Sequence, residues 1–126
     1  DYYEVTRDPR AVPIMNGLAK FLVTGVTASG DVMYQCGVPY RHVNYHAAVT
    51  MAAIWQFVQQ VPGTELVDLQ DLIRRQVPLI LQQLQAKQRP DGSLPHSRGD
   101  YRVLTDQRSY PRYLAMMLLH FLLTDL

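Results

Sequence analysis

The longest polar interruption in the chain, residues 89–113, carries most of the side chains that could bind or move charge. Arginine recurs through it, and the planar guanidinium group suits paired hydrogen bonds to carboxylate or phosphate oxygens. Loops of this length are usually either functional or disordered, and the prolines and tyrosines of this one favour order. We therefore expect this stretch to form one wall of a binding site. Its candidate side chains are His96, Arg98, Tyr101, Arg102, Arg108 and Tyr110.

A second group of polar side chains precedes an apolar segment, in the sequence Tyr40-Arg41-His42-Val43-Asn44-Tyr45-His46. His42 and His46 are four residues apart, which is the spacing of a helical zinc pair. A zinc protease would place glutamate directly after the first histidine, and valine stands there instead. We therefore expect no metal ion and no cofactor, and we interpret these side chains as candidates for contact with a ligand.

Two amphipathic helices are expected, over residues 8–25 and 66–88. Asp8-Pro9 is a helix-start signal, because aspartate caps a helix and proline is tolerated in its first turn. The later segment has its apolar residues in one stripe, with a kink expected at Pro78. Each of these helices should bury one face and leave the other in solvent.

Two further helices, over residues 40–60 and 111–123, are apolar on most sides, as is typical of helices buried by several neighbours. Two amphipathic helices cannot cover both of them completely. We therefore expect an exposed apolar face, which would be covered in a homo-oligomer or by the remainder of a longer chain.

The order of amphipathic helix, link and apolar helix occurs twice, in residues 8–60 and 66–124. A repeat of about 60 residues favours stacked structural units. The sequence thus predicts an all-α fold of two antiparallel hairpins, similar to a segment of an α/α toroid, with residues 1–126 as a single helical domain or fragment. A four-helix bundle is the alternative, although a bundle would make all four helices amphipathic. In the hairpin arrangement both links lie at the same end, so residues 40–46 should meet residues 89–113.

The residues at these two links resemble those of a known group of enzymes. Asn44 and His46 stand at the head of an apolar helix, and Asp91-Gly92-Ser93-Leu94-Pro95 follows one hairpin later. Arginines come next, and then Tyr110 leads into another apolar helix. This combination resembles the alginate lyases with α/α-toroid folds and, more broadly, toroid-fold polysaccharide lyases and six-hairpin glycosidases.

The resemblance implies β-elimination on a uronic acid polysaccharide or oligosaccharide. Asn44, His46 and either Arg102 or Arg108 would neutralise the substrate carboxylate, which makes the neighbouring ring proton acidic. Tyr110 would remove that proton and return one to the leaving oxygen. Such an enzyme would work in the periplasm or outside the cell.

A segment of a six-hairpin glycoside hydrolase is the first alternative. Glycosidases need two carboxyl groups, about 5–9 Å apart, on either side of the cleaved bond. Glu4 and Glu65 are expected at the far end of the hairpins. The aspartates at the link end are Asp31, Asp91, Asp100 and Asp106. Asp31 and Asp91 have the surroundings of turn residues, so a second acid would have to come from outside the chain.

A non-catalytic helical module, which uses its apolar helices for interaction or oligomerisation, is the second alternative. Composition bounds the choice of partners. The chain is 48% hydrophobic and 18% charged, as in globular domains, and its net charge of +1 gives no indication of a nucleic-acid partner. It has no apolar run of the roughly 18 residues that would predict a membrane span.

Overall fold

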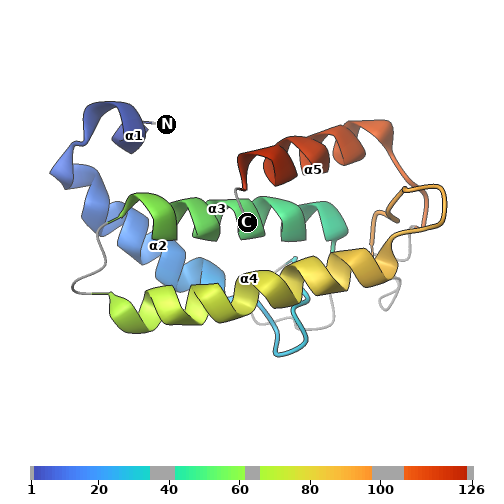
Figure 1. The fold of residues 1–126 in the computed structure, drawn as a ribbon, viewed down its shortest axis with the longest axis horizontal. Helices are drawn as coiled ribbons and strands as arrows, with labels where there is room; N and C mark the ends of the chain where they lie inside the picture. The colour runs from blue at the N-terminus through green and yellow to red at the C-terminus, as the bar shows by residue number, and fades with distance from the viewer. Residues whose placement is uncertain (1, 35–41, 62–65, 98–106, 125–126) are drawn as a thin grey trace.

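The computed structural model describes residues 2–34, 42–61, 66–97 and 107–124, and the regular elements within them are helices. The prediction of an all-α fold is confirmed. Figure 1 shows the arrangement of the helices. They are α1 (Tyr2–Thr6), the short 3-10 helix η1 (Pro9–Ala11), α2 (Val12–Thr24), α3 (Asn44–Gln60), α4 (Val67–Lys87) and α5 (Pro111–Leu123).

The helix-start signal at Asp8 begins η1, with α2 following directly. The Asp8 carboxylate accepts the backbone N–H of Arg10 at 2.9 Å, and the Arg10 guanidinium lies 2.7 Å from the same carboxylate. This carboxylate therefore satisfies a backbone donor that the first turn would otherwise leave unpaired. Pro13 lies at the start of α2, where a missing N–H breaks no helical hydrogen bond.

Helix α3 is the centre of the fold, and α2, α4 and α5 all pack against it (Figure 1). Met51 and Ile54 of α3 are completely buried. The prediction that this segment is buried on more than one side is therefore confirmed. The helix begins at Asn44, later than expected, because Val43 before it has extended backbone and pairs with Ser97.

Helix α4 has the single apolar stripe that its sequence predicted. The stripe is buried and consists of Leu69, Ile73, Val77, Ile80 and Leu84. The helix continues through Pro78 to Lys87 as one element. Within the part of the chain that the structure describes, no helix combines the length and the apolarity of a membrane span.

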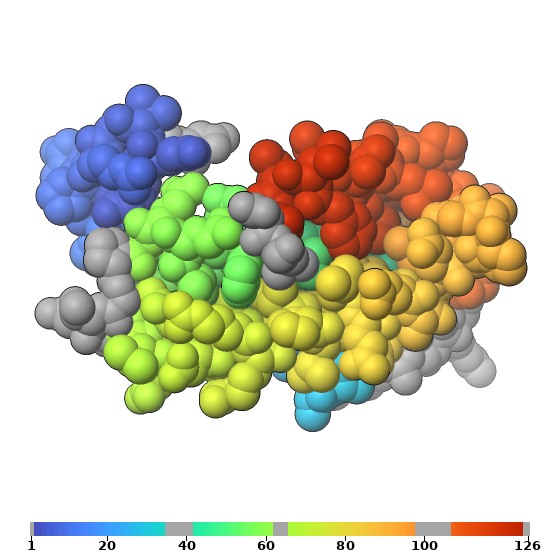
Figure 2. Space-filling view, viewed as in Figure 1, coloured from blue at the N-terminus to red at the C-terminus, as the bar shows by residue number. Residues whose placement is uncertain are grey.

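Helix α5 differs from the expectation of a buried inner helix. Met117 is its one buried residue, and four of its leucines are more than half exposed. The reason is that α5 packs mainly against α3 and has no second helix over its outer side among the described elements. Figure 2 shows the surface of α3 visible between α1 and α5. This agrees with the expectation that part of the apolar surface stays uncovered.

A tight turn fixes the link after α2 to the side of α4. Gly30 has a positive φ of 88°, and a Cβ atom there would lie 2.3 Å from the carbonyl oxygen of Leu79. Next to it, the buried Asp31 carboxylate lies 2.5 Å from Nζ of Lys87 at the end of α4. The expected turn at residues 29–31 therefore has a packing reason as well as a conformational one.

Candidate functional site

Backbone hydrogen bonds join the segment before α3 to the two segments that lead from α4 to α5. The Asn44 side-chain amide donates to the carbonyl oxygen of Pro95 at 2.7 Å, and the Asn44 backbone N–H donates to that of His96 at 3.0 Å. His96 in turn donates its backbone N–H to the carbonyl of Arg108 at 3.0 Å. Residues 42–44, 94–97 and 107–109 thus form one hydrogen-bonded strip, which we call the seam.

Side chains reinforce the seam from its α5 side. The Ser109 hydroxyl donates to the carbonyl of Leu94 at 2.8 Å, and the Gln107 side chain donates to that of Ser97 at 3.1 Å. Arg89 donates to Ser109 at 3.0 Å and also to the carbonyl of Gln107. Arg89 therefore holds the backbone, and it is not one of the arginines that face solvent for a ligand.

Five aromatic side chains lie together at the seam. These five, together with Arg108 and Arg112, form what we call the rim cluster. The rings are Tyr45, His46, His96, Tyr110 and Tyr113. Tyr45 and Tyr113 are stacked, with centroids 4.5 Å apart and an interplanar angle of 9°. His96 contacts Tyr110 edge-to-face at 5.7 Å and Tyr113 at 5.1 Å. Residues from α3, from the 94–97 segment and from α5 therefore form one group of rings.

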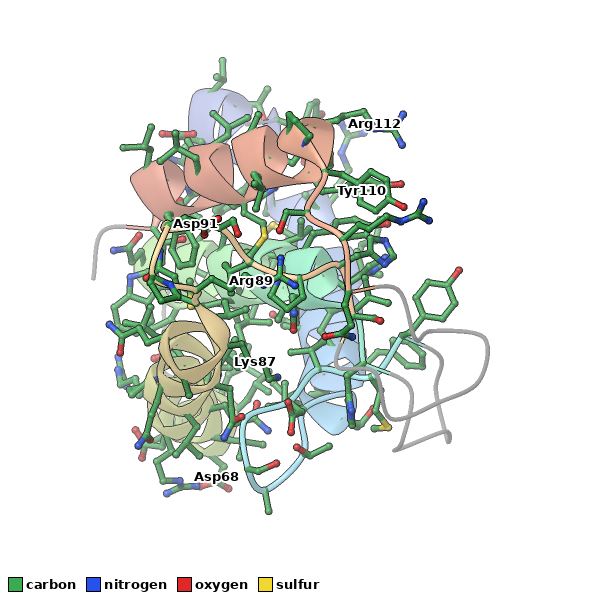
Figure 3. All side chains as sticks on the ribbon, turned by 90° about the vertical axis from the view of Figure 1, so that its right-hand side faces the viewer. Asp68, Lys87, Arg89, Asp91, Tyr110 and Arg112 are labelled. Atoms are coloured by element: carbon green, nitrogen blue, oxygen red, sulfur yellow. The ribbon has the colours of Figure 1, made fainter. Side chains whose placement is uncertain are left out.

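Two exposed arginines lie against the outer rings of this cluster. The guanidinium carbon of Arg108 is 5.5 Å from the centroid of Tyr110. That of Arg112 is 4.8 Å from the centroid of Tyr113, and its Nη2 donates to the Tyr113 hydroxyl at 2.9 Å. Figure 3 shows Tyr110 and Arg112 projecting to the same side where α5 begins. Cation–π contact at an exposed site is weak, so the Arg112 guanidinium can turn toward an anion at little cost.

A cavity of about 400 Å³ lies beside these side chains. It is lined by His96, Tyr110, Pro111, Arg112 and Tyr113. Its walls thus supply aromatic faces, phenolic hydroxyl groups and one guanidinium group. Aromatic faces pack on the apolar faces of rigid rings, and a guanidinium binds carboxylate oxygens in pairs. The cavity therefore suits a small ligand that has both a ring and an anionic group.

Two titratable rings of the rim cluster, His46 and Tyr45, favour their neutral forms. Burial, and to a lesser extent the charge of His96, lowers the pKa of His46 below its usual value of 6.5. Burial also raises the pKa of Tyr45 above 10.0, with Tyr113 and Tyr34 adding to the effect. At neutral pH, His46 is therefore an uncharged imidazole and Tyr45 a protonated phenol. Arg108 and Arg112 supply positive charge at the site.

The two histidines of the cluster each have an unusual ring nitrogen. Nε2 of His46 and Nδ1 of His96 are buried, and neither has a hydrogen-bond partner among the described residues. Such atoms are uncommon in folded proteins and mark strained or functional positions. Within the same described ranges, no three metal-binding side chains come together.

The structure brings together five of the residues that the sequence nominated. They are Tyr45, His46, His96, Arg108 and Tyr110. Asn44 and His42 lie beneath them and are 2% and 3% exposed. The side-chain amide of Asn44 donates to the backbone carbonyl of Pro95, so Asn44 joins the two links. The other nominated residues, Arg41, Arg98, Tyr101 and Arg102, lie outside the described ranges.

Two residues of the rim cluster were not nominated from the sequence. Arg112 and Tyr113 belong to the first turn of α5, directly after Tyr110 and Pro111. Tyr110 and Tyr113 are three residues apart, and residues at this spacing are neighbours on a helix surface. The Pro111 start signal combined with this spacing could have identified both residues.

The carboxylates that a glycosidase would need are engaged elsewhere or lie outside the described residues. Asp31 is paired with Lys87, and Asp91 accepts the backbone N–H of Ser93 at 2.9 Å within its own turn. Glu4 lines a different cavity, between α2 and α5. Glu65, Asp100 and Asp106 are outside the described ranges. The rim cluster as described is therefore a basic and aromatic site.

Comparison of this chain with protein-family models, with curated proteins and with solved structures gave no match. The chemistry of the rim cluster is therefore the basis on which a function can be argued.

Proposed function

We propose that the protein binds acidic saccharides at the rim cluster and cleaves them by β-elimination. The observation that supports this most directly is the cavity walled by Tyr110, Tyr113, His96 and Arg112. A uronic acid unit has a ring face that can pack on tyrosine and a carboxylate that can pair with a guanidinium. A neutral ligand would make no ion pair with the Arg112 guanidinium.

In this proposal Arg108 and Arg112 neutralise the charge of the substrate carboxylate. Their positive charge stabilises the carbanion that forms when the adjacent C–H proton is removed. Tyr110 must begin this step as the phenolate: its oxygen accepts the proton and becomes a phenol, the freed electron pair forms a carbon–carbon double bond, and the bond to the leaving oxygen breaks. A proton returns from Tyr110 to that oxygen, so the enzyme ends the cycle unchanged.

The remaining residues support the site in different ways. His46 and His96 offer hydrogen bonds to sugar hydroxyl groups, and their buried nitrogens can gain a partner when side chains shift on binding. Asn44 acts as a positioning residue, because its amide holds the two links together. We further propose that α2–α3 and α4–α5 are the two units of a toroid-like arrangement, in which α5 packs on α3 of the first unit.

The test is incubation of the chain with a polyuronate such as alginate. The lyase proposal expects ultraviolet absorbance from an unsaturated uronate, and Tyr110→Phe should abolish it while keeping the ring. A hydrolase of the six-hairpin kind would release reducing ends without that absorbance. Absence of both signals would contradict cleavage, and calorimetric titration with acidic oligosaccharides would then test binding alone.

The variant Arg112→Ala distinguishes an effect on ligand binding from an effect on the stability of the fold. We expect binding of an acidic oligosaccharide to weaken at least tenfold, since a charge-assisted contact is worth roughly 1.5–3 kcal/mol. The stability of the chain should change little because Arg112 is exposed. Arg10→Ala, which alters an arginine remote from the rim cluster, is the matched control. An unchanged affinity in Arg112→Ala would contradict the proposed carboxylate contact.

A non-catalytic interaction module is the second candidate function. The observation in its favour is the set of exposed apolar side chains on α2 and α5. Such patches mark interaction surfaces when they exceed the size usual for monomers. This role does not exclude saccharide binding, because the two surfaces have different residues.

A further inference from the structure

A row of aromatic rings connects the cavity of the rim cluster to an exposed tyrosine at its edge. Tyr113 belongs to the cavity wall, and Tyr45 is stacked on it. His46 follows, with its ring centroid 4.2 Å from that of Tyr45. Tyr34 is next in the row and contacts His46 edge-to-face, with the centroids 5.3 Å apart. The aromatic surface of the site therefore extends beyond the residues that line the cavity.

The backbone before Tyr34 is held against the rest of the fold. Met33 pairs with His42, just before α3, and its backbone N–H donates to the carbonyl of Gly25 at 2.9 Å. Val32, on the other side of Met33, is buried. Tyr34 is nevertheless 51% exposed. The fold thus fixes the point from which this side chain projects and leaves half of the residue in solvent.

Exposure alone does not mark Tyr34 as a binding residue, since single apolar side chains are common on protein surfaces. Two observations distinguish it. Its ring continues the row that starts at the cavity, and a tyrosine offers a rigid contact surface at a low cost in conformational entropy. His46, which contacts both Tyr34 and Tyr45, has a buried Nε2 without a hydrogen-bond partner among the described residues. A sugar hydroxyl near Tyr34 would supply that partner when the rings shift on binding.

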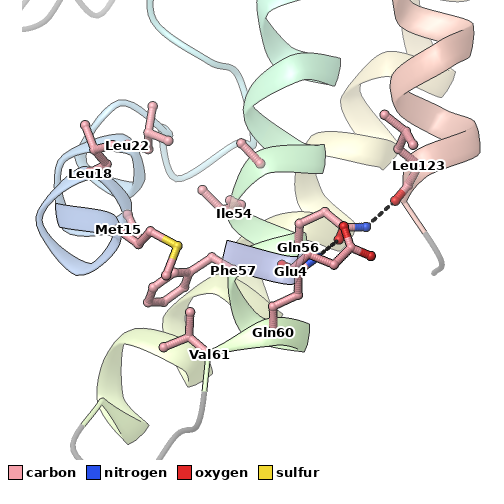
Figure 4. Close-up of a pocket in the computed structure, with 12 residues that line it drawn as sticks. Glu4, Met15, Leu18, Leu22, Ile54, Gln56, Phe57, Gln60, Val61 and Leu123 are labelled. Carbon is pink, nitrogen blue, oxygen red and sulfur yellow. Dashed lines mark hydrogen bonds between the residues drawn. The ribbon is translucent and has the colours of Figure 1, made fainter. Parts of the chain in front are cut away.

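The cavity between α2 and α5 has a different lining (Figure 4). Among the described residues that line it, Phe57 is the one aromatic side chain, and the polar side chains are those of Glu4, Gln56 and Gln60. The carboxylate of Glu4 would repel that of a uronic acid. Ring faces and guanidinium groups occur together at the rim cluster, so a longer acidic ligand should follow the row of rings there.

We propose that Tyr34 forms a second sugar-binding position, so that the site takes an acidic oligosaccharide with one unit in the cavity and a later unit on the Tyr34 ring. This inference rests on the saccharide binding proposed above and adds the length of the ligand. The unit in the cavity pairs its carboxylate with Arg112. The later unit belongs to the same ligand, so its contact with Tyr34 is intramolecular and raises the affinity even though it is weak by itself.

The test is calorimetric titration with mannuronate oligosaccharides, from the disaccharide to the hexasaccharide, in a Tyr110→Phe background that prevents cleavage. We expect the affinity to rise about three- to tenfold at the length that reaches Tyr34, as one aromatic contact supplies. Tyr34→Ala should remove this rise and leave the affinity for the disaccharide unchanged. Tyr34→Phe, which retains the ring, should retain the rise. Tyr2→Ala, at a 61% exposed tyrosine of α1, is the matched control and should bind as the parent does.

The outcomes separate this inference from the function on which it rests. If the disaccharide binds but the rise with length persists in Tyr34→Ala, or all lengths lose affinity equally, the second position is wrong and acidic-saccharide binding stands. An affinity that does not depend on length in the parent has the same meaning. Absence of binding at every length would contradict the proposed function and this inference with it. Tyr34→Leu, which keeps apolar bulk without a ring, should also lose the rise and replaces Tyr34→Ala if that variant does not fold.

Discussion

The rim cluster contrasts with the exposed apolar side chains of α2 and α5, which we call the α2–α5 face. The two regions differ in how their side chains are covered, although both lie against α3. At the rim, polar groups from three segments are hydrogen-bonded to each other, and the rings pack on this frame. At the face, apolar side chains remain in contact with water. The geometry of the rim cluster is therefore fixed by contacts within one chain, whereas no other element packs over the apolar side chains of the α2–α5 face among the described residues. The first arrangement suits recognition of a small polar ligand and the second suits association.

The largest difference should appear between two ion pairs outside these regions, one buried and one with an exposed arginine. The side chains of Lys87 and Asp31 are 19% and 3% exposed, so Lys87→Met leaves a buried carboxylate without its cation. We expect a loss of about 3–5 kcal/mol in the free energy of unfolding, measured by urea denaturation. Arg10→Met breaks the pair between Asp8 and the 86% exposed side chain of Arg10, and it should cause a much smaller loss. Similar losses in both variants would contradict the comparison.

The next effect concerns the seam. Asn44→Ala removes the donor to the Pro95 carbonyl and should lower the free energy of unfolding by roughly 1–3 kcal/mol. On the face, Ile14→Ala alters a side chain that is 66% exposed and should change stability by less than about 0.5 kcal/mol in dilute, monomeric protein. The measurement is the urea midpoint of unfolding of each variant. Equal shifts in the two midpoints would show that the Asn44 hydrogen bond contributes no more to stability than an exposed side chain does.

The smallest effect is a pH dependence confined to the rim. Because the pKa of His46 is lowered in the folded chain, the unfolded chain binds this proton more readily. The corresponding stability is present above about pH 6.5 and is lost as the pH falls further. The urea midpoint should therefore be lower at about pH 5 than at about pH 7.5.

His46→Phe keeps a ring beside Tyr45 and Tyr34 but cannot titrate, so it should flatten this dependence. The carboxylate of Asp8, whose pKa is lowered to about 2 chiefly by Arg10, titrates below the chosen window. A slope that is unchanged in His46→Phe would assign the effect to another group.

Much of the fold follows from the spacing of apolar residues. The stripe of α4 was predicted because its sequence fixes which side is apolar, and burial follows that side closely. The exposure of α5 could not be predicted in the same way. Its apolar residues lie on all sides, and periodicity does not say how many neighbouring helices are present to cover them.

The candidate site likewise has features that the sequence predicted and features that it did not. The sequence predicted that the two links would meet, and the structure does bring Tyr45 and Tyr110 into one cluster. The role of Asn44 could not be inferred, because its partner is the backbone carbonyl of Pro95, 51 residues away. A sequence motif identifies a side chain, but whether that side chain faces the ligand or the backbone depends on contacts that form only in the folded chain.

The hydrogen bond from Asn44 to Pro95 also has a consequence for how the chain folds. Contacts between residues far apart in sequence carry a large loop-closure cost, so they tend to form after local helices and the hairpin between α3 and α4. The tyrosine stack should thus mature late. In a stopped-flow refolding experiment, the near-ultraviolet signal of the tyrosines would trail the far-ultraviolet signal of the helices.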